Sequence, residues 1–145
     1  MFDLDWMLEI SMAGRLLFAA FLGALIGLER EFHHQAAGVR TYAAVAMGAC
    51  SFALISMHAA NAPDPTRISA QVVSGIGFIG AGIIFKHGDR TSGLTTAATV
   101  WATASVGMAV AYRMLLLPIL ASVILMGLLA MHHLWSHNKN GDGSA

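Results

Sequence analysis

Long apolar runs separated by short polar segments dominate the chain. They predict five membrane-spanning helices, at residues 6–28, 41–60, 68–85, 94–112 and 114–135. A helix needs about 20 mostly apolar residues to cross the hydrocarbon core of a bilayer. The connecting segments are short, so neighbouring spans are expected to be antiparallel. The predicted fold is an all-α, polytopic transmembrane helical bundle over residues 1–137, followed by a disordered polar tail at 138–145.

The boundary between the fourth and fifth runs is open to two interpretations. Only Tyr112 and Arg113 separate them, and Pro118 follows shortly afterwards. A proline inside a helix kinks it. The sequence is therefore compatible with two helices or with one long bent helix.

Composition supports the membrane interpretation. Hydrophobic residues make up 57% of the chain and charged residues 11%, against about 25% charged in a soluble domain. The mean hydropathy is +0.66. The net charge is zero, which gives no indication of nucleic-acid binding. Cys50 is the single cysteine and lies in an apolar run, so we expect a packed thiol and no disulfide.

Charged residues predict the orientation. No basic residue precedes Arg15, which is atypical of a cleaved signal peptide, so the first span is expected to remain in the mature protein. One predicted side holds Arg30, Arg40, Lys86, Arg90 and Lys139, and the other holds Arg67 and Arg113. Because positive loops stay in the cytoplasm, the N-terminus is predicted outside and the C-terminus inside.

The segment from Asp64 to Gly82 begins like a helix and continues with many small residues. Asp64 is suited to the N-cap and Pro65 to the first helical position. Ile68 to Phe85 contains no charge but four glycines: Gly75, Gly77, Gly80 and Gly82. In lipid such a helix persists, and small residues let another helix approach. We expect this span to form a packing core.

Residues 75–80 also match the dinucleotide pattern G-x-G-x-x-G. That motif requires a preceding strand and an acidic residue about 20 positions later. The preceding residues predict helix, and Asp89 comes too early, so nucleotide binding is not favoured.

Small residues recur at helical spacing in three spans. The stripes are Ala19, Gly23 and Gly27; Ala70, Ser74, Gly77 and Ala81; and Thr95, Thr99, Thr103 and Gly107. They predict helix–helix contact faces. The candidate packing residues are Gly23, Gly27, Ser74, Gly75, Gly77, Gly80, Gly82, Thr99 and Thr103. The fifth span lacks such a stripe and is expected to face lipid.

Ionisable residues near the membrane are candidate functional groups. Arg15 is expected to snorkel or to pair across helices, because it does not share a face with Glu9. Glu29, Arg30, Glu31 and Arg40 suit interfacial anchors, or a charged cluster at a cavity mouth in which Glu29 pairs with an arginine of another span. Asp64 suits a helix cap or an outward cation site.

Other polar residues allow further alternatives. A seam between the third and fourth spans would serve interhelical hydrogen bonding or an ion path; its members are Gln71, Ser74, Thr95, Thr96, Thr99 and Thr103. His133 and His137 suit an interface or a metal site. The chain contains no HExxH, GxGD or Walker motif. We therefore expect no enzyme activity, no cofactor and no bound metal.

Four ordered blocks resemble the MgtC/SapB family of bacterial inner-membrane proteins. They are Gly23–Glu31 (GALIGLERE), Gly38–Thr41 (GVRT), Asp64–Gly82, and Gly93–Ala98 (GLTTAA) with Trp101. The resemblance extends from about Arg15 to Gly107. By position it points to these polar residues: Glu29, Arg30, Arg40, Asp64, Arg67, Gln71, Thr95 and Thr96.

The resemblance implies a multi-pass inner-membrane protein linked to magnesium limitation and, in pathogens, to survival inside macrophages. The best-known member is thought to restrain the membrane sector of the proton-translocating ATP synthase. The best-known members also carry a cytoplasmic C-terminal domain, which is not expected here because this chain stops at Ala145.

Three functional hypotheses follow. The first is a non-enzymatic regulator that docks, through its small-residue helices, with another membrane protein or with a second copy of itself. The alternative is a transporter or channel subunit for a small ion such as Mg²⁺ or H⁺. A third is a purely structural assembly protein. Membrane lipid is an expected partner in every case, and nucleic acid is not.

Overall fold

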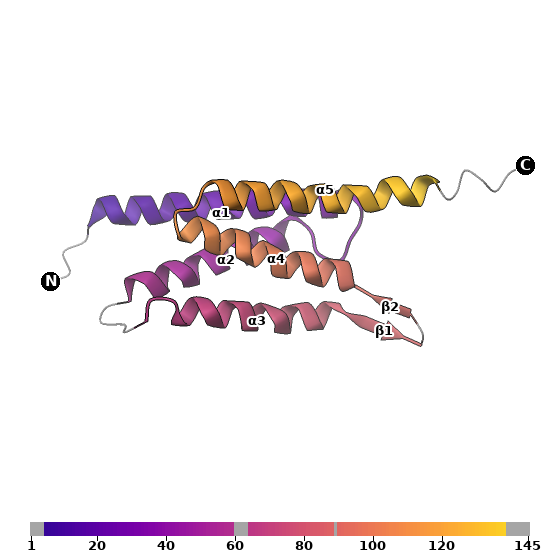
Figure 1. The fold of residues 1–145 in the computed structure, drawn as a ribbon, viewed down its shortest axis with the longest axis horizontal. Helices are drawn as coiled ribbons and strands as arrows, with labels where there is room; N and C mark the ends of the chain where they lie inside the picture. The colour runs from indigo at the N-terminus through magenta and orange to yellow at the C-terminus, as the bar shows by residue number, and fades with distance from the viewer. Residues whose placement is uncertain (1–4, 60–63, 89, 139–145) are drawn as a thin grey trace, which may run out of the picture.

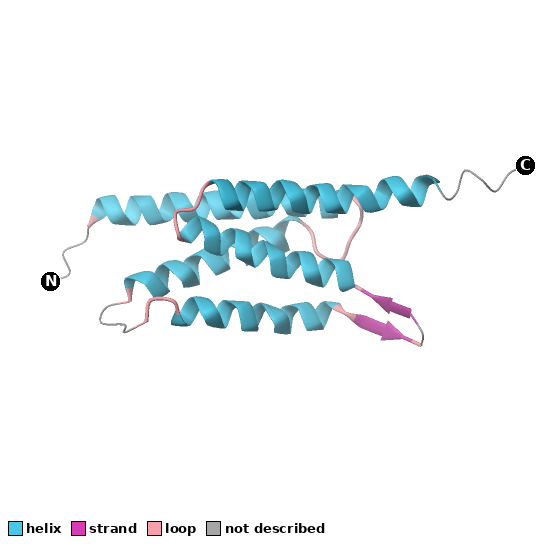
Figure 2. Cartoon of the chain, viewed as in Figure 1, coloured by secondary structure: helices cyan, strands magenta, loops and turns pink. Residues whose placement is uncertain are grey.

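The computed structural model describes residues 5–59, 64–88 and 90–138, with no side-chain placement for His87 or for residues 132–138. It contains five helices and one hairpin over these residues (Figure 1, Figure 2). The elements are α1 (Trp6–Phe32), α2 (Val39–His58), α3 (Arg67–Ile83), β1 (Phe85–His87), β2 (Arg90–Ser92), α4 (Leu94–Ala111) and α5 (Leu116–Asn138). The all-α class is confirmed. The predicted tail lies outside the described residues from position 139 onward.

Three of these helices, α1, α2 and α4, are long and apolar enough to cross a membrane. The helix α3 and residues 116–131 of α5 are shorter apolar helices. The elements lie roughly parallel to one long axis (Figure 1). Several apolar helices with this arrangement are typical of a multi-pass membrane protein.

The segment after α3 departs from the prediction. The helix ends at Ile83, and residues 85–92 form an antiparallel hairpin in which Phe85 pairs with Ser92. The chain enters α4 through Gly93, which has φ +85°, and a Cβ there would collide with the carbonyl oxygen of Ile83. Only glycine accepts both conditions without strain. The span that was predicted to reach Phe85 therefore ends two residues earlier, at Ile83, where the hairpin and Gly93 follow.

Helices α4 and α5 are separate. Arg113 has φ +60°, and its N–H donates to the carbonyl of Val110 while that of Met114 donates to Ala109, which ends α4 in a tight turn. Pro118 is the third residue of α5, where backbone N–H groups have no partner within the helix. Pro118 therefore lies in the first turn of a new helix instead of kinking a long one.

The centre of the bundle is a three-helix contact at Ala46 of α2. A Cβ on Gly23 of α1 would lie 2.8 Å from the Ala46 Cβ, and a Cβ on Gly107 of α4 would collide with the Ala46 carbonyl oxygen. Nearby, a Cβ on Gly27 would lie 2.6 Å from the Cα of Val39. Glycine at these positions lets three backbones approach, as the stripes of α1 and α4 predicted.

The helix α3 contradicts its prediction as a packing core. It packs against α2 and α4, but a Cβ on Gly75, Gly77 or Gly82 would meet nothing within 4 Å. Of the four glycines in this run, Gly80 alone approaches another helix, with its Cβ position 3.7 Å from the Ala97 Cβ. Most of this glycine run is thus unused inside the chain.

The helix α5 packs on α1 and α4 and leaves most of its described apolar side chains exposed. These include Leu116, Leu117, Leu120, Val123 and Leu128. An exposed apolar face of this kind is what a lipid-facing helix requires.

Gly107→Ala should lower the free energy of unfolding by about 2 kcal/mol, because its new methyl group collides with the backbone of α2. The measurement is thermal unfolding in detergent. Gly127→Ala in α5 is the matched control, since a Cβ there meets nothing within 4 Å. Equal melting of the two variants would contradict the close contact at Ala46.

Candidate functional site

A buried ion pair lies near the end of α1. Arg30 Nε donates to Glu29 Oε2 at 2.7 Å, and Arg30 Nη2 donates to Glu29 Oε1 at 3.2 Å. The two side chains are only 8% and 12% exposed, so neither charge would be stable there without the other. His33 Nδ1 lies 2.7 Å from the Glu29 carbonyl oxygen. The expected pairing of Glu29 with an arginine of another span is wrong, because the adjacent Arg30 occupies it.

Glu31, by contrast, organises the turn into α2. Its Oε2 accepts a hydrogen bond from the Val39 N–H at 3.0 Å and so caps the start of that helix. A Cβ on Gly38 would lie 2.7 Å from the same oxygen. The segment Glu29-Arg30-Glu31 therefore contains a buried ion pair and also fixes the connection between α1 and α2.

A hydroxyl chain continues from this end into the core. Tyr42 OH lies 2.5 Å from Thr99 Oγ1, which itself donates to the Thr96 carbonyl at 3.0 Å. Because Thr99 has one hydroxyl proton, Tyr42 is the donor in the first contact. Polar groups of α2 and α4 thus meet in the buried interior, in addition to the buried ion pair of α1.

Tyr42 was not among the predicted site residues. The available signal was a tyrosine inside an apolar run, since a buried phenol requires a hydrogen-bond partner.

The predicted seam between α3 and α4 does not form. Thr99 bonds to α2, and Thr103 donates to the Thr99 carbonyl on its own helix at 2.8 Å. Thr95 is exposed and lines a hollow shared with α5, whereas Gln71 is exposed on the side of α3 that faces α2. Ser74 is also exposed. These side chains therefore do not meet as one polar path.

Hydrogen bonds between helices gather at the opposite end of the bundle. Arg15 Nη1 donates to the Ala111 carbonyl at 3.0 Å, which places a cation at the C-terminus of α4. The prediction that Arg15 pairs across helices is confirmed. Tyr112 OH donates to Ser69 Oγ at 3.0 Å and so joins the turn after α4 to α3.

The start of α3 depends on a serine that the sequence analysis missed. Ser56 Oγ donates to the Pro65 carbonyl at 2.6 Å and accepts from the Ile68 N–H at 3.2 Å. Asp64 instead accepts from the N–H and hydroxyl of Thr66, at 2.8 and 2.7 Å. These bonds lower the pKa of the Asp64 carboxyl. The helix begins at Arg67 with Thr66 at the N-cap, so the predicted cap position is two residues too early.

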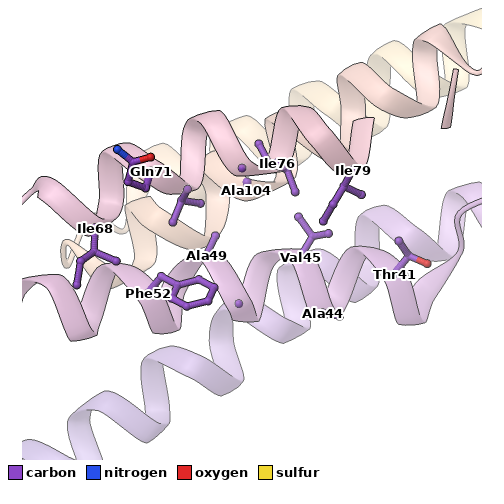
Figure 3. Close-up of a pocket in the computed structure, with 13 residues that line it drawn as sticks. Thr41, Ala44, Val45, Ala49, Phe52, Ile68, Gln71, Ile76, Ile79 and Ala104 are labelled. Carbon is purple, nitrogen blue, oxygen red and sulfur yellow. The ribbon is translucent and has the colours of Figure 1, made fainter. Parts of the chain in front are cut away.

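An apolar groove separates α2 from α3 (Figure 3). Its volume is about 560 Å³, and residues of α2 and α3, with Ala104 of α4, line it. Val45 and Phe52 extend from one wall, and Ile76 and Ile79 from the other. Thr41 and Gln71 are its polar lining residues.

The sequence raised a metal site and a nucleotide site as alternatives. No group of three His, Cys, Asp or Glu side chains in the described residues is arranged to hold a metal ion. The side chains of His133 and His137 lie outside the described residues. The G-x-G-x-x-G pattern at 75–80 lies inside α3 and follows helix, not strand, so it lacks the context for binding a dinucleotide.

Comparison with known proteins identifies one family and several related proteins. Residues 16–137 match the MgtC family. The chain is 54% identical over 90 residues to Protein MgtC of Brucella abortus (62% of this chain, 38% of that protein). It is 54% identical over 94 residues to Protein MgtC of Salmonella typhimurium (64% and 40%). It is 39% identical over 139 residues to an uncharacterized protein of Haemophilus influenzae (87% and 58%).

The aligned part covers about 38–40% of the length of the two MgtC proteins. No solved structure matches the chain. Because the family model matches residues 16–137, well over half of the chain, the chain belongs to the MgtC family.

Proposed function

We propose that this chain is a non-enzymatic regulator of the bacterial inner membrane that acts by docking α3 against a partner membrane protein. The observation that carries the proposal is the stripe of small residues on α3, which no other part of the described chain covers. Ala70, Ser74, Gly77 and Ala81 share one helix face, and all four are exposed. Small residues on an open face of a membrane helix let a second backbone approach closely.

A large side chain lies beside this stripe. Phe78 is 85% exposed and follows Ser74 by one helical turn. A large side chain beside small residues gives a surface that a partner helix can recognise by shape. By family resemblance, the partner is the membrane sector of the ATP synthase or a second copy of this chain, and the setting is magnesium limitation.

Transport of Mg²⁺ or H⁺ is the second candidate. One observation favours it: Glu29, Arg30, Tyr42 and Thr99 are polar groups buried inside an apolar bundle. Ionisable groups at such depth mark ion pathways in many membrane proteins. Against it, the polar seam between α3 and α4 is missing, and the groove between α2 and α3 is apolar.

Gly77→Leu should abolish docking, because the leucine fills the space that a partner backbone needs. The assay uses cells in which the gene for this protein is deleted and a variant is supplied instead. We expect the Gly77→Leu variant to restore growth at limiting magnesium at least about tenfold less well than the unaltered protein, the effect of losing about 1.4 kcal/mol of association free energy. Gly127→Leu is the matched control, since both positions are open. Membrane levels and melting temperatures should match for the two variants. Equal rescue by both would refute docking through this face.

Flux measurements in sealed proteoliposomes separate the two candidates. With Mg²⁺ and H⁺ tested in turn, we expect no saturable flux from the folded protein. Saturable flux that Glu29→Gln or Asp64→Asn reduces, with Arg90→Gln unaffected and all variants folded, would overturn the regulator proposal in favour of transport.

A further inference from the structure

The groove between α2 and α3 is open to the surroundings and separate from the docking stripe. Along α2 it extends from Thr41 to Phe52, and along α3 from Ile79 to Ile68. At 1.5 Å per residue, this is a length of about 16 Å. The hydrocarbon core of one leaflet is about 15 Å thick, half of the full core. The groove is therefore as long as one lipid acyl chain in a leaflet.

The lining suits an acyl chain. Its lining residues are apolar except for Thr41 and Gln71, which lie toward its two ends. The groove has a volume of about 560 Å³, and its continuous apolar lining suits a single hydrocarbon chain.

An unpaired cation marks one mouth of the groove. Arg40 is exposed and makes no hydrogen bond or ion pair with its side chain in the described part of the chain. Arg40 precedes Ala44, a residue that lines the groove, by four positions, so it lies one helical turn closer to the N-terminus of α2. The Thr41 side chain lies at the same mouth (Figure 3).

The charges around this mouth favour an anion. Lys86 and Arg90 of the hairpin after α3 are also exposed. Counting Asp89, the hairpin sequence carries one net positive charge. The Glu31 carboxylate accepts a hydrogen bond from the Val39 N–H and forms no ion pair with Arg40 in the described residues. At the other mouth, the positive charge of Arg67 is accompanied by the negative charge of Asp64 three residues earlier, so the net charge of that pair is zero.

We propose that this groove is a binding site for one anionic phospholipid, with an acyl chain between α2 and α3 and the headgroup phosphate at Arg40. The site is distinct from the docking stripe and does not depend on the proposed regulatory role. It takes phosphatidylglycerol in preference to phosphatidylcholine, because the zwitterionic headgroup compensates its own phosphate.

Native mass spectrometry of the full chain in detergent tests the site, with added phosphatidylglycerol or phosphatidylcholine as probe. We expect one tightly held phosphatidylglycerol. Arg40→Gln should weaken its retention about fivefold, the effect of one basic residue at an anionic lipid surface. Retention of phosphatidylcholine should not change. Arg67→Gln at the other mouth is the matched charge control and should leave both unchanged.

A second variant tests the groove itself. Gly48→Leu fills the α2 wall, where a Cβ meets nothing within 4 Å, so folding should survive. It should displace the bound phosphatidylglycerol, whereas Gly127→Leu should not. The proposal fails if phosphatidylglycerol and phosphatidylcholine bind equally well. It also fails if the Arg40→Gln and Gly48→Leu variants retain phosphatidylglycerol as well as the unaltered protein does. It also fails if Gly48→Leu blocks a protein partner without affecting lipid, because the occupant is then a helix.

Discussion

The close approach of three backbones at Ala46 is the constraint on which the rest of the bundle depends. Gly23 of α1 and Gly107 of α4 both lie against this residue, so neither helix places a side chain of its own between its backbone and α2 there. In a bilayer, lipid tails remove most of the hydrophobic drive for helices to associate. Dispersion contacts between closely packed backbones replace it, and they require glycine where the helices touch.

The polar interior follows from this contact. Tyr42 lies one turn before Ala46 on α2, so fixing Ala46 also fixes the phenol against Thr99 of α4. The same approach brings the end of α1 close to the start of α2, where Glu31 caps Val39. The buried charge of Arg30 is matched by Glu29, and two hydrogen bonds of 2.7 and 3.2 Å offset part of the cost of removing both charges from water.

The sequence was sufficient for the helices because each is a long apolar run, and sufficient for the stripes of α1 and α4 because glycine spacing is local information. It could not show which stripe is used inside the chain. The richest one, on α3, faces outward, whereas Gly23 and Gly107 do the packing. The hairpin at 85–92 was missed because three-residue strands carry too little pattern, and Ser56 because its partners lie 9 and 12 residues away.

Both ends of α3 are fixed by specific contacts, and Ile76 and Gly80 are buried between them. Ser56 binds its start, Tyr112 bonds to Ser69 in its first turn, and Gly93 packs against Ile83 at its finish. Between these points, successive residues turn by about 100°, so Gly75 in the groove and Gly77 on the stripe lie about 200° apart. The two surfaces therefore face opposite ways, and a lipid on one leaves the other free for a partner. The groove and the stripe share no residue of α3. A coupling between lipid and partner would therefore act through the position of α3 and not through a shared side chain.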